Sequence, residues 1–105
     1  MGTASFHVGK YARNRGAGAA TIISSEVRVS GAFTTSTSAA NLEDSTNTDI
    51  TMAQGEILQV HASEAMRIRF GGVAATASTG IYIPEGAQVE IECNNPGTVS
   101  IIDVA

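Results

Sequence analysis

Apolar and polar residues alternate along much of the second half of the chain. The clearest case runs from Met66 to Phe70, where Arg67 and Arg69 stand between apolar residues. A period of two is typical of a β-strand with one buried face. Alternating or continuous apolar runs bounded by turn residues predict seven or eight strands, over residues 22–30, 33–37, 50–52, 56–62, 66–70, 81–83, 89–93 and 99–104.

Turn residues recur about every 10–12 residues in the second half, a spacing typical of a β-sandwich or barrel. The examples are Pro84-Glu85-Gly86 and Asn94-Asn95-Pro96-Gly97. In the second turn, proline suits the second position of a type II turn and Gly97 the position that needs positive φ. Residues 21–105 are therefore predicted to form one antiparallel β-sandwich or jelly-roll/barrel-like domain, with Gly31 interrupting the strand signal before 33–37.

Apolar positions on the inward side of these strands form the predicted core. Cys93 is in register with Val89 and Ile91, so we expect a buried and inert thiol. The other predicted core residues are Val27, Val29, Leu58, Val60, Met66, Ile68, Phe70, Ile81, Ile83, Val99 and Ile101.

Residues 1–20 differ from the rest of the chain. They contain four glycines, three basic residues and no acidic residue, so they carry +3 while residues 21–105 carry −7. This pattern predicts an extended N-terminal arm, and two interpretations stay open: an unstructured tail, or an arm that orders on a neighbouring chain. Ordering a glycine-rich segment costs about 1–2 kcal/mol per residue, so the second needs a receiving surface. The arm residues expected to contact a partner are Phe6, Val8, Lys10, Tyr11, Arg13 and Arg15.

The composition supports the β prediction and narrows the function. Ten Ile, eight Val and eleven Thr stand against two Leu, and β-branched side chains favour strands. The 105 residues suit one domain.

The charge and the apolar runs exclude two classes of partner. Ten acidic against six basic residues argue against a nucleic-acid partner, and no apolar run approaches the ~20 residues of a membrane span. The first 20 residues lack the apolar stretch of a signal peptide, so we expect a chain that is made in the cytoplasm and is not secreted.

Candidate chemistry is sparse. His7, His61 and Cys93 lack the short spacings of local metal motifs, so no cofactor or metal is expected. The acidic segment 41–49 is either a solvated loop or a Ca²⁺ site, although it lacks the glycine and final glutamate of an EF-hand loop. Tyr82 is the single outward aromatic residue that suits a sugar platform. The polar residues show no convergence of the kind that an active site needs, so no enzymatic activity is expected.

Two rows of opposite charge face outward on separate predicted strands. Arg67 and Arg69 form the basic row, and Glu90 and Glu92 form the acidic row. If the two strands are neighbours, the rows meet as cross-strand ion pairs. The alternative is that the arginines face another chain, where carboxylate contacts would confer specificity.

The segment from Ile57 to Val104 resembles small virion structural proteins of tailed bacteriophages. The resemblance is carried by the order of features: the strand Met66–Gly71 (MRIRFG), the Ala/Thr/Ser loop Val73–Thr79, a strand, the turn Pro84–Gly86, an alternating strand and a final β-branched strand. It covers a little under half of the chain. The first half carries no motif of that family.

The resemblance implies a non-enzymatic part of the phage particle. Capsid decoration or cement proteins are small, β-rich and commonly trimeric, and they bind the major capsid protein on the outer surface of the head. The expected partners are therefore the major capsid protein and further copies of the chain, with a trimer favoured and with no nucleic acid or membrane. A tail, head–tail junction or head-fibre component remains an alternative, as does a glycan-binding β-sandwich module.

Overall fold

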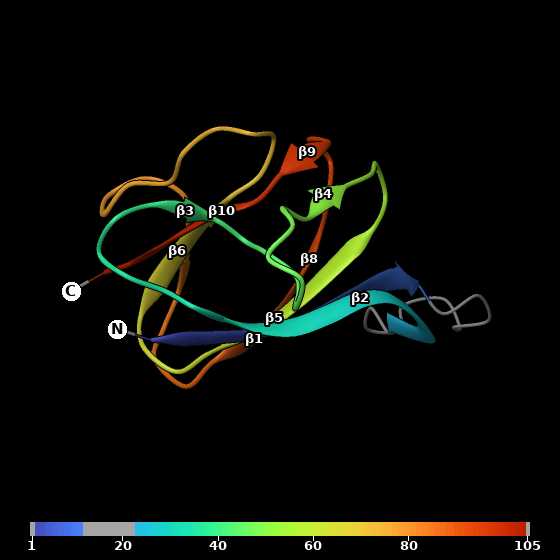
Figure 1. Cartoon of the computed structure of the whole chain (residues 1–105), viewed down its shortest axis with the longest axis horizontal. Helices are drawn as coiled ribbons and strands as arrows, with labels where there is room; N and C mark the ends of the chain where they lie inside the picture. Colours follow the sequence, from blue (N-terminus) through green and yellow to red (C-terminus); the bar gives the residue numbers. More distant parts are fainter. Residues whose placement is uncertain (1, 12–22, 105) are drawn as a thin grey trace, which may run out of the picture.

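The computed structural model describes residues 2–11 and 23–104, and within these ranges the chain forms strands and no helix, which confirms the predicted all-β class. No helix in this part of the chain could cross a membrane. The strands, coloured in chain order in Figure 1, are β1 (Thr3–Tyr11), β2 (Ile23–Thr34), β3 (Ala40–Asn41), β4 (Thr51–Met52), β5 (Ile57–Ala62), β6 (Met66–Arg69), β7 (Ile81–Ile83), β8 (Gln88–Glu92), β9 (Gly97–Thr98) and β10 (Ser100–Asp103).

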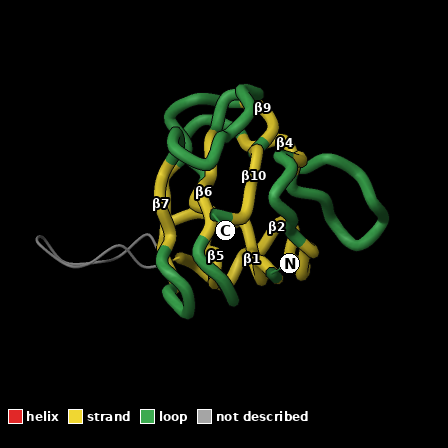
Figure 2. Tube along the Cα trace, turned by 90° about the vertical axis from the view of Figure 1, so that its left-hand side faces the viewer, coloured by secondary structure: helices red, strands yellow, loops and turns green. Residues whose placement is uncertain are grey.

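The strands pair antiparallel in three sheets. Sheet A has the order β2-β1-β5-β8, sheet B has the order β3-β10-β6-β7, and β4 pairs with β9 in a small third sheet. Over the described residues, each four-stranded sheet has two edges and does not close on itself. Figure 2 shows the strands of sheet A nearly end on, below β6, β7 and β10 of sheet B.

One hydrophobic core joins the inner faces of sheets A and B. Sheet A contributes alternate residues of β1 and β5, and sheet B contributes alternate residues of β6 together with β10. The core also takes in Cys93, which is fully buried as predicted. The predicted core residues that the structure places there as buried side chains are Leu58, Val60, Met66, Ile68, Ile83, Val99 and Ile101.

The core prediction is wrong for two residues, and both lie on edge strands. Ile81 is opposite the buried Ile68 but is 44% exposed, because no strand of the described chain lies beyond β7. Val27 is 45% exposed and lies on β2, an outer strand of sheet A. Four more predicted core residues are only half-buried: Val29, Phe70, Val89 and Ile91.

The predicted N-terminal arm is also wrong over residues 3–11. These residues form β1, an inner strand of sheet A that pairs with β2 on one side and β5 on the other. Phe6 and Val8 are buried in the core and cannot meet a partner. The physical reason is that apolar residues recur with a period of two and so share one face of the strand, which is buried. These residues are Ala4, Phe6 and Val8, with polar or small residues between them. Residues 12–20 of the predicted arm lie outside the described residues.

Gly31 does not interrupt a strand, because β2 runs through it. Gly31 pairs across the sheet with Phe6, and a Cβ atom built at Gly31 would lie 3.3 Å from Cζ of the phenylalanine ring. The glycine therefore leaves room for a large cross-strand neighbour.

Candidate interaction sites

The hairpin of β1 and β2 extends past the rest of sheet A. The pairing of β1 with β5 ends at Gly9, opposite Ile57, while β1 and β2 stay paired as far as Tyr11 and Ile23 (Figure 1). The exposed Lys10 belongs to this two-stranded extension. Arg13 and Arg15, expected to contact a partner, lie outside the described residues.

A β-bulge at the base of this hairpin redirects Arg28. Val8 pairs with Val29 and Gly9 pairs with Val27, so Arg28 is the extra residue. Because Val29 packs against the core, regular alternation would turn Arg28 to the outer face of sheet A. A bulge re-aims a side chain, and this one lets the arginine reach residues beside β4 and β5.

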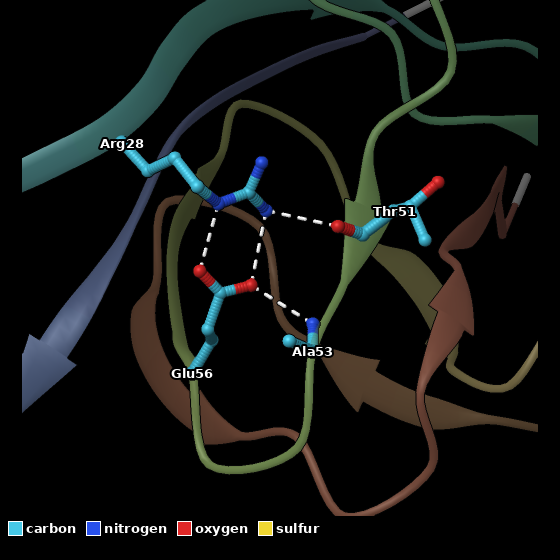
Figure 3. A network of polar contacts seen from close by, with 4 residues as sticks. All are labelled: Arg28, Thr51, Ala53 and Glu56. Atoms are coloured by element: carbon cyan, nitrogen blue, oxygen red, sulfur yellow. Dashed lines mark hydrogen bonds and ion pairs between the residues drawn. The ribbon is translucent and has the colours of Figure 1, made fainter.

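Arg28 forms a two-point ion pair with Glu56. Its Nε donates to Oε2 at 2.7 Å and its Nη2 donates to Oε1 at 3.0 Å, while Nη2 also donates to the carbonyl of Thr51 at 2.9 Å (Figure 3). Oε1 of Glu56 further accepts the backbone N–H of Ala53 at 2.9 Å. This network fixes the base of the hairpin to the turn between β4 and β5. The sequence pattern had placed Glu56 at the start of a strand without a role.

The Glu56 carboxyl is buried, with 8% of the residue exposed. Burial by itself raises its pKa, but the hydrogen bonds from Arg28 and Ala53 and the positive charges of Arg28 and Lys10 outweigh it, so the pKa lies below its ordinary value. The folded state therefore favours the ionised carboxylate.

Glu56→Gln is expected to cost about 1–2 kcal/mol of unfolding free energy at pH 7, because it removes charge-assisted hydrogen bonds. A carboxyl with a lowered folded pKa stabilises fully above its unfolded pKa of about 4.3 and loses that stability as the pH falls through the folded pKa. Urea unfolding at pH 7 and pH 3 should therefore show a smaller difference between variant and parent at pH 3. Glu85→Gln, at an exposed turn residue, is the control and should change little at either pH. An equal cost of Glu56→Gln at both pH values would contradict the ion pair.

A groove lies at the open edge between β7 and β8. Its cavity volume is about 660 Å³, and apolar side chains from both sheets and the adjoining loops line it, with Arg69, Glu92 and two asparagines among the polar residues. The apolar lining side chains that are exposed or half-buried are Phe70, Val73, Ile81, Ile91 and Pro96. The groove follows from topology, because β7 and β8 are the last strands of their sheets.

The two charged rows do not meet as cross-strand neighbours. Arg67 and Arg69 lie on β6, which pairs with β7 and β10, whereas Glu90 and Glu92 lie on β8, which pairs with β5 in the other sheet. The condition for the cross-strand interpretation therefore fails. Arg69 and Glu92 do line the same groove.

Arg67 holds the loop that precedes β7. Its Nε donates to the carbonyl of Ala77 at 3.1 Å and its Nη1 to the carbonyl of Gly80 at 2.9 Å. The guanidinium carbon lies 5.2 Å from the centre of the Tyr82 ring, a cation–π distance. One face of Tyr82, the candidate sugar platform, thus already carries a side chain of this protein.

Segment 41–49 is a loop closed by its own carboxylates. Oδ1 of Asp44 accepts the hydroxyl and N–H of Thr46 at 2.6 and 2.8 Å and the N–H of Thr48 at 3.1 Å. The Thr46 hydroxyl bond, followed by these backbone bonds, lowers the pKa of Asp44. Asp49 accepts from the Asn41 amide at 3.0 Å. Glu43 forms a backbone β-bridge with Asp49, so the carboxylates of Asp44 and Asp49 serve loop structure while Glu43 contributes its backbone.

Cys93 lies apart from the two histidines. His7 and His61 lie on β1 and β5 and line a shallow cavity of about 330 Å³ on sheet A, with Gln59 and Ser5 as their direct cross-strand neighbours. Cys93 is in the core, where burial raises the pKa of its thiol. Among the described residues, no three His, Cys, Asp or Glu side chains are grouped to hold a metal ion.

No family model matches the sequence, and neither the curated proteins nor the solved structures contain a match. The hairpin and the groove are accordingly interpreted from their own geometry and charge.

Proposed function

We propose that the protein is a non-enzymatic structural component of a tailed-phage virion, a capsid decoration protein. It binds the major capsid protein and further copies of itself on the surface of the head. In this proposal sheets A and B form a β-sandwich that presents several contact surfaces at once. The observation that supports it is the β1–β2 hairpin, which extends beyond the rest of sheet A and whose first strand, β1, belongs to the basic residues 1–20.

The physical argument is that this extension gains from a receiving surface. A two-stranded ribbon by itself is marginally stable in water, and β1 and β2 have lost the support of β5 beyond Gly9. The Arg28–Glu56 ion pair fixes the direction of the ribbon at its base. Lys10, Arg13 and Arg15 give residues 1–20 a charge of +3 against −7 for the remainder, which suits an acidic neighbour.

The first test locates the protein and counts its copies. Gold-labelled antibodies against the chain should mark the heads of intact virions, and light scattering of the purified protein should give three times the chain mass of 10.8 kDa. Labelling of tails or of the head–tail junction would favour the alternative component. Labelling of no particle would overturn the virion role.

A charge-matched pair of variants tests the hairpin itself. Lys10→Gln and Thr37→Glu both change exposed residues and both lower the net charge by one unit. Binding to virions stripped of the protein, measured by co-sedimentation, should weaken about two- to fivefold for Lys10→Gln at low salt, since an exposed charge contact contributes up to about 1 kcal/mol. Thr37→Glu should bind like the parent. Equal weakening of both variants would mean that only net charge matters.

A further inference from the structure

We propose that the free edge of β8 binds an extended segment of a partner protein in which basic and apolar residues alternate. The segment adds to sheet A as a fifth strand and places its apolar side chains in the groove between β8 and β7. This inference rests on the geometry of β8 and does not depend on the proposed virion role.

The backbone of β8 offers hydrogen-bonding groups to an incoming strand. The N–H of Cys93 donates to Glu56 at 2.8 Å, and the carbonyl of Ala87 accepts from Ala62 at 3.0 Å, so odd-numbered residues around β8 face β5. Antiparallel strands alternate in this respect, so the N–H and C=O groups of Gln88 and Glu90 point away from β5, to the outer edge of sheet A. An extended peptide pairs with such groups by β-augmentation.

The side chains of β8 specify the segment. Val89 and Ile91 face the core side of the sheet but stay half-buried, because β8 is the outermost strand of sheet A in the described chain. Together with Ile81, which is 44% exposed, they leave apolar surface for the partner's apolar residues to cover. Glu90 is exposed on the opposite side of β8 and favours arginine or lysine at the alternate positions of the segment, although Arg69 lines the groove.

A second copy of this chain does not supply the segment from its described residues. The longest stretch of alternating basic and apolar residues there is Met66–Phe70, and β6 is already paired with β10 and β7. Pairing of β8 with another β8 places glutamates opposite one another or opposite Gln88, which disfavours the contact by like-charge repulsion. The described residues of a second copy therefore do not fit this edge, and the proposed occupant is a segment of a different protein.

The test uses the whole chain and a short fluorescein-labelled peptide of alternating arginine and valine. Fluorescence anisotropy should show binding that weakens with salt, and the same peptide with glutamate in place of arginine should not bind. Ile81→Ser should weaken binding about tenfold. Its control is Val27→Ser, an equally exposed apolar residue on the other edge of sheet A, which should bind like the parent. Binding that is unchanged by Ile81→Ser would overturn the groove as the docking site.

Two further variants at one position separate charge from backbone pairing. Glu90→Gln keeps the N–H and should weaken peptide binding about threefold at low salt, with no effect at high salt. Glu90→Pro also removes the outward N–H, which β5 does not use, and should weaken binding at least tenfold at any salt concentration. Thermal unfolding verifies that both variants fold. If a folded Glu90→Pro binds as tightly as Glu90→Gln, strand addition at β8 is excluded. A change of oligomeric state in Glu90→Pro would instead identify the occupant as a second copy and overturn the proposal.

Discussion

Leu58→Ala is expected to lower the free energy of unfolding by about 3–5 kcal/mol. Leu58 is fully buried in β5, an inner strand of sheet A, and lies between Val8 of β1 and Ile91 of β8. Truncation removes apolar area from the core and leaves a cavity that strands paired on both sides cannot close. Urea denaturation at pH 7 measures the loss, which is a large share of the roughly 5–15 kcal/mol that stabilises a domain.

Val27→Ala is the matched comparison, because its side chain is 45% exposed on β2. Val27→Ala is expected to lower the free energy of unfolding by no more than about 1 kcal/mol. The sequence pattern assigned Leu58 and Val27 equally to the core, so the two variants together test the strand order of sheet A. Similar losses for both would contradict the placement of β2 at the edge.

Gly80→Ala is expected to cost about 3 kcal/mol or more, because strain and a backbone clash add. Gly80 has a φ of 118°, a value that residues with a Cβ atom rarely adopt, and an added Cβ would lie 2.9 Å from the carbonyl oxygen of Ile68. Relief of that clash would shift β7 away from β6. It would also displace the Gly80 carbonyl that accepts from Arg67. Thermal and urea unfolding measure the effect.

Gly86→Ala separates the clash from the strain. Gly86 has a φ of 78°, but an added Cβ would meet no atom within 4 Å. Only the cost of positive φ applies, about 1–2 kcal/mol. If Gly80→Ala cost no more than Gly86→Ala, the close packing of Gly80 on β6 would be wrong.

Strand periodicity predicted much of the fold, including β5, β6, β7 and β8 and the inward face of each. It did not reveal which strands are neighbours. Exposure of Ile81 depends on β7 being the last strand of sheet B, and that order is set by long-range pairing. The same limit explains why the cross-strand interpretation of Arg67 and Glu90 fails: they have suitable charges but lie in different sheets.

The first strand was missed because glycines and basic residues outweighed a short alternating signal. Ala4, Phe6 and Val8 have the period of a strand, and the same rule applied to residues 3–8 would have found it. Leu42 was missed for a similar reason: it lies in a polar segment, yet it is fully buried and its N–H donates to the carbonyl of Val99. The Arg28–Glu56 ion pair depends on the bulge in β2, and no local sequence pattern predicts that bulge.

The order of strands along the chain has a consequence for how the protein folds. Strand β1, second in sheet A, gains one neighbour early in the sequence, β2, but its other neighbour, β5, begins only at Ile57. Strand β10, an inner strand of sheet B, comes after all the others and pairs with both β3 and β6. The inner faces of sheets A and B therefore cannot fully cover one another until residues 100–103 have left the ribosome. A chain in synthesis exposes its apolar residues throughout, and folding should be slow, because closure of long loops precedes most of the stabilising contacts.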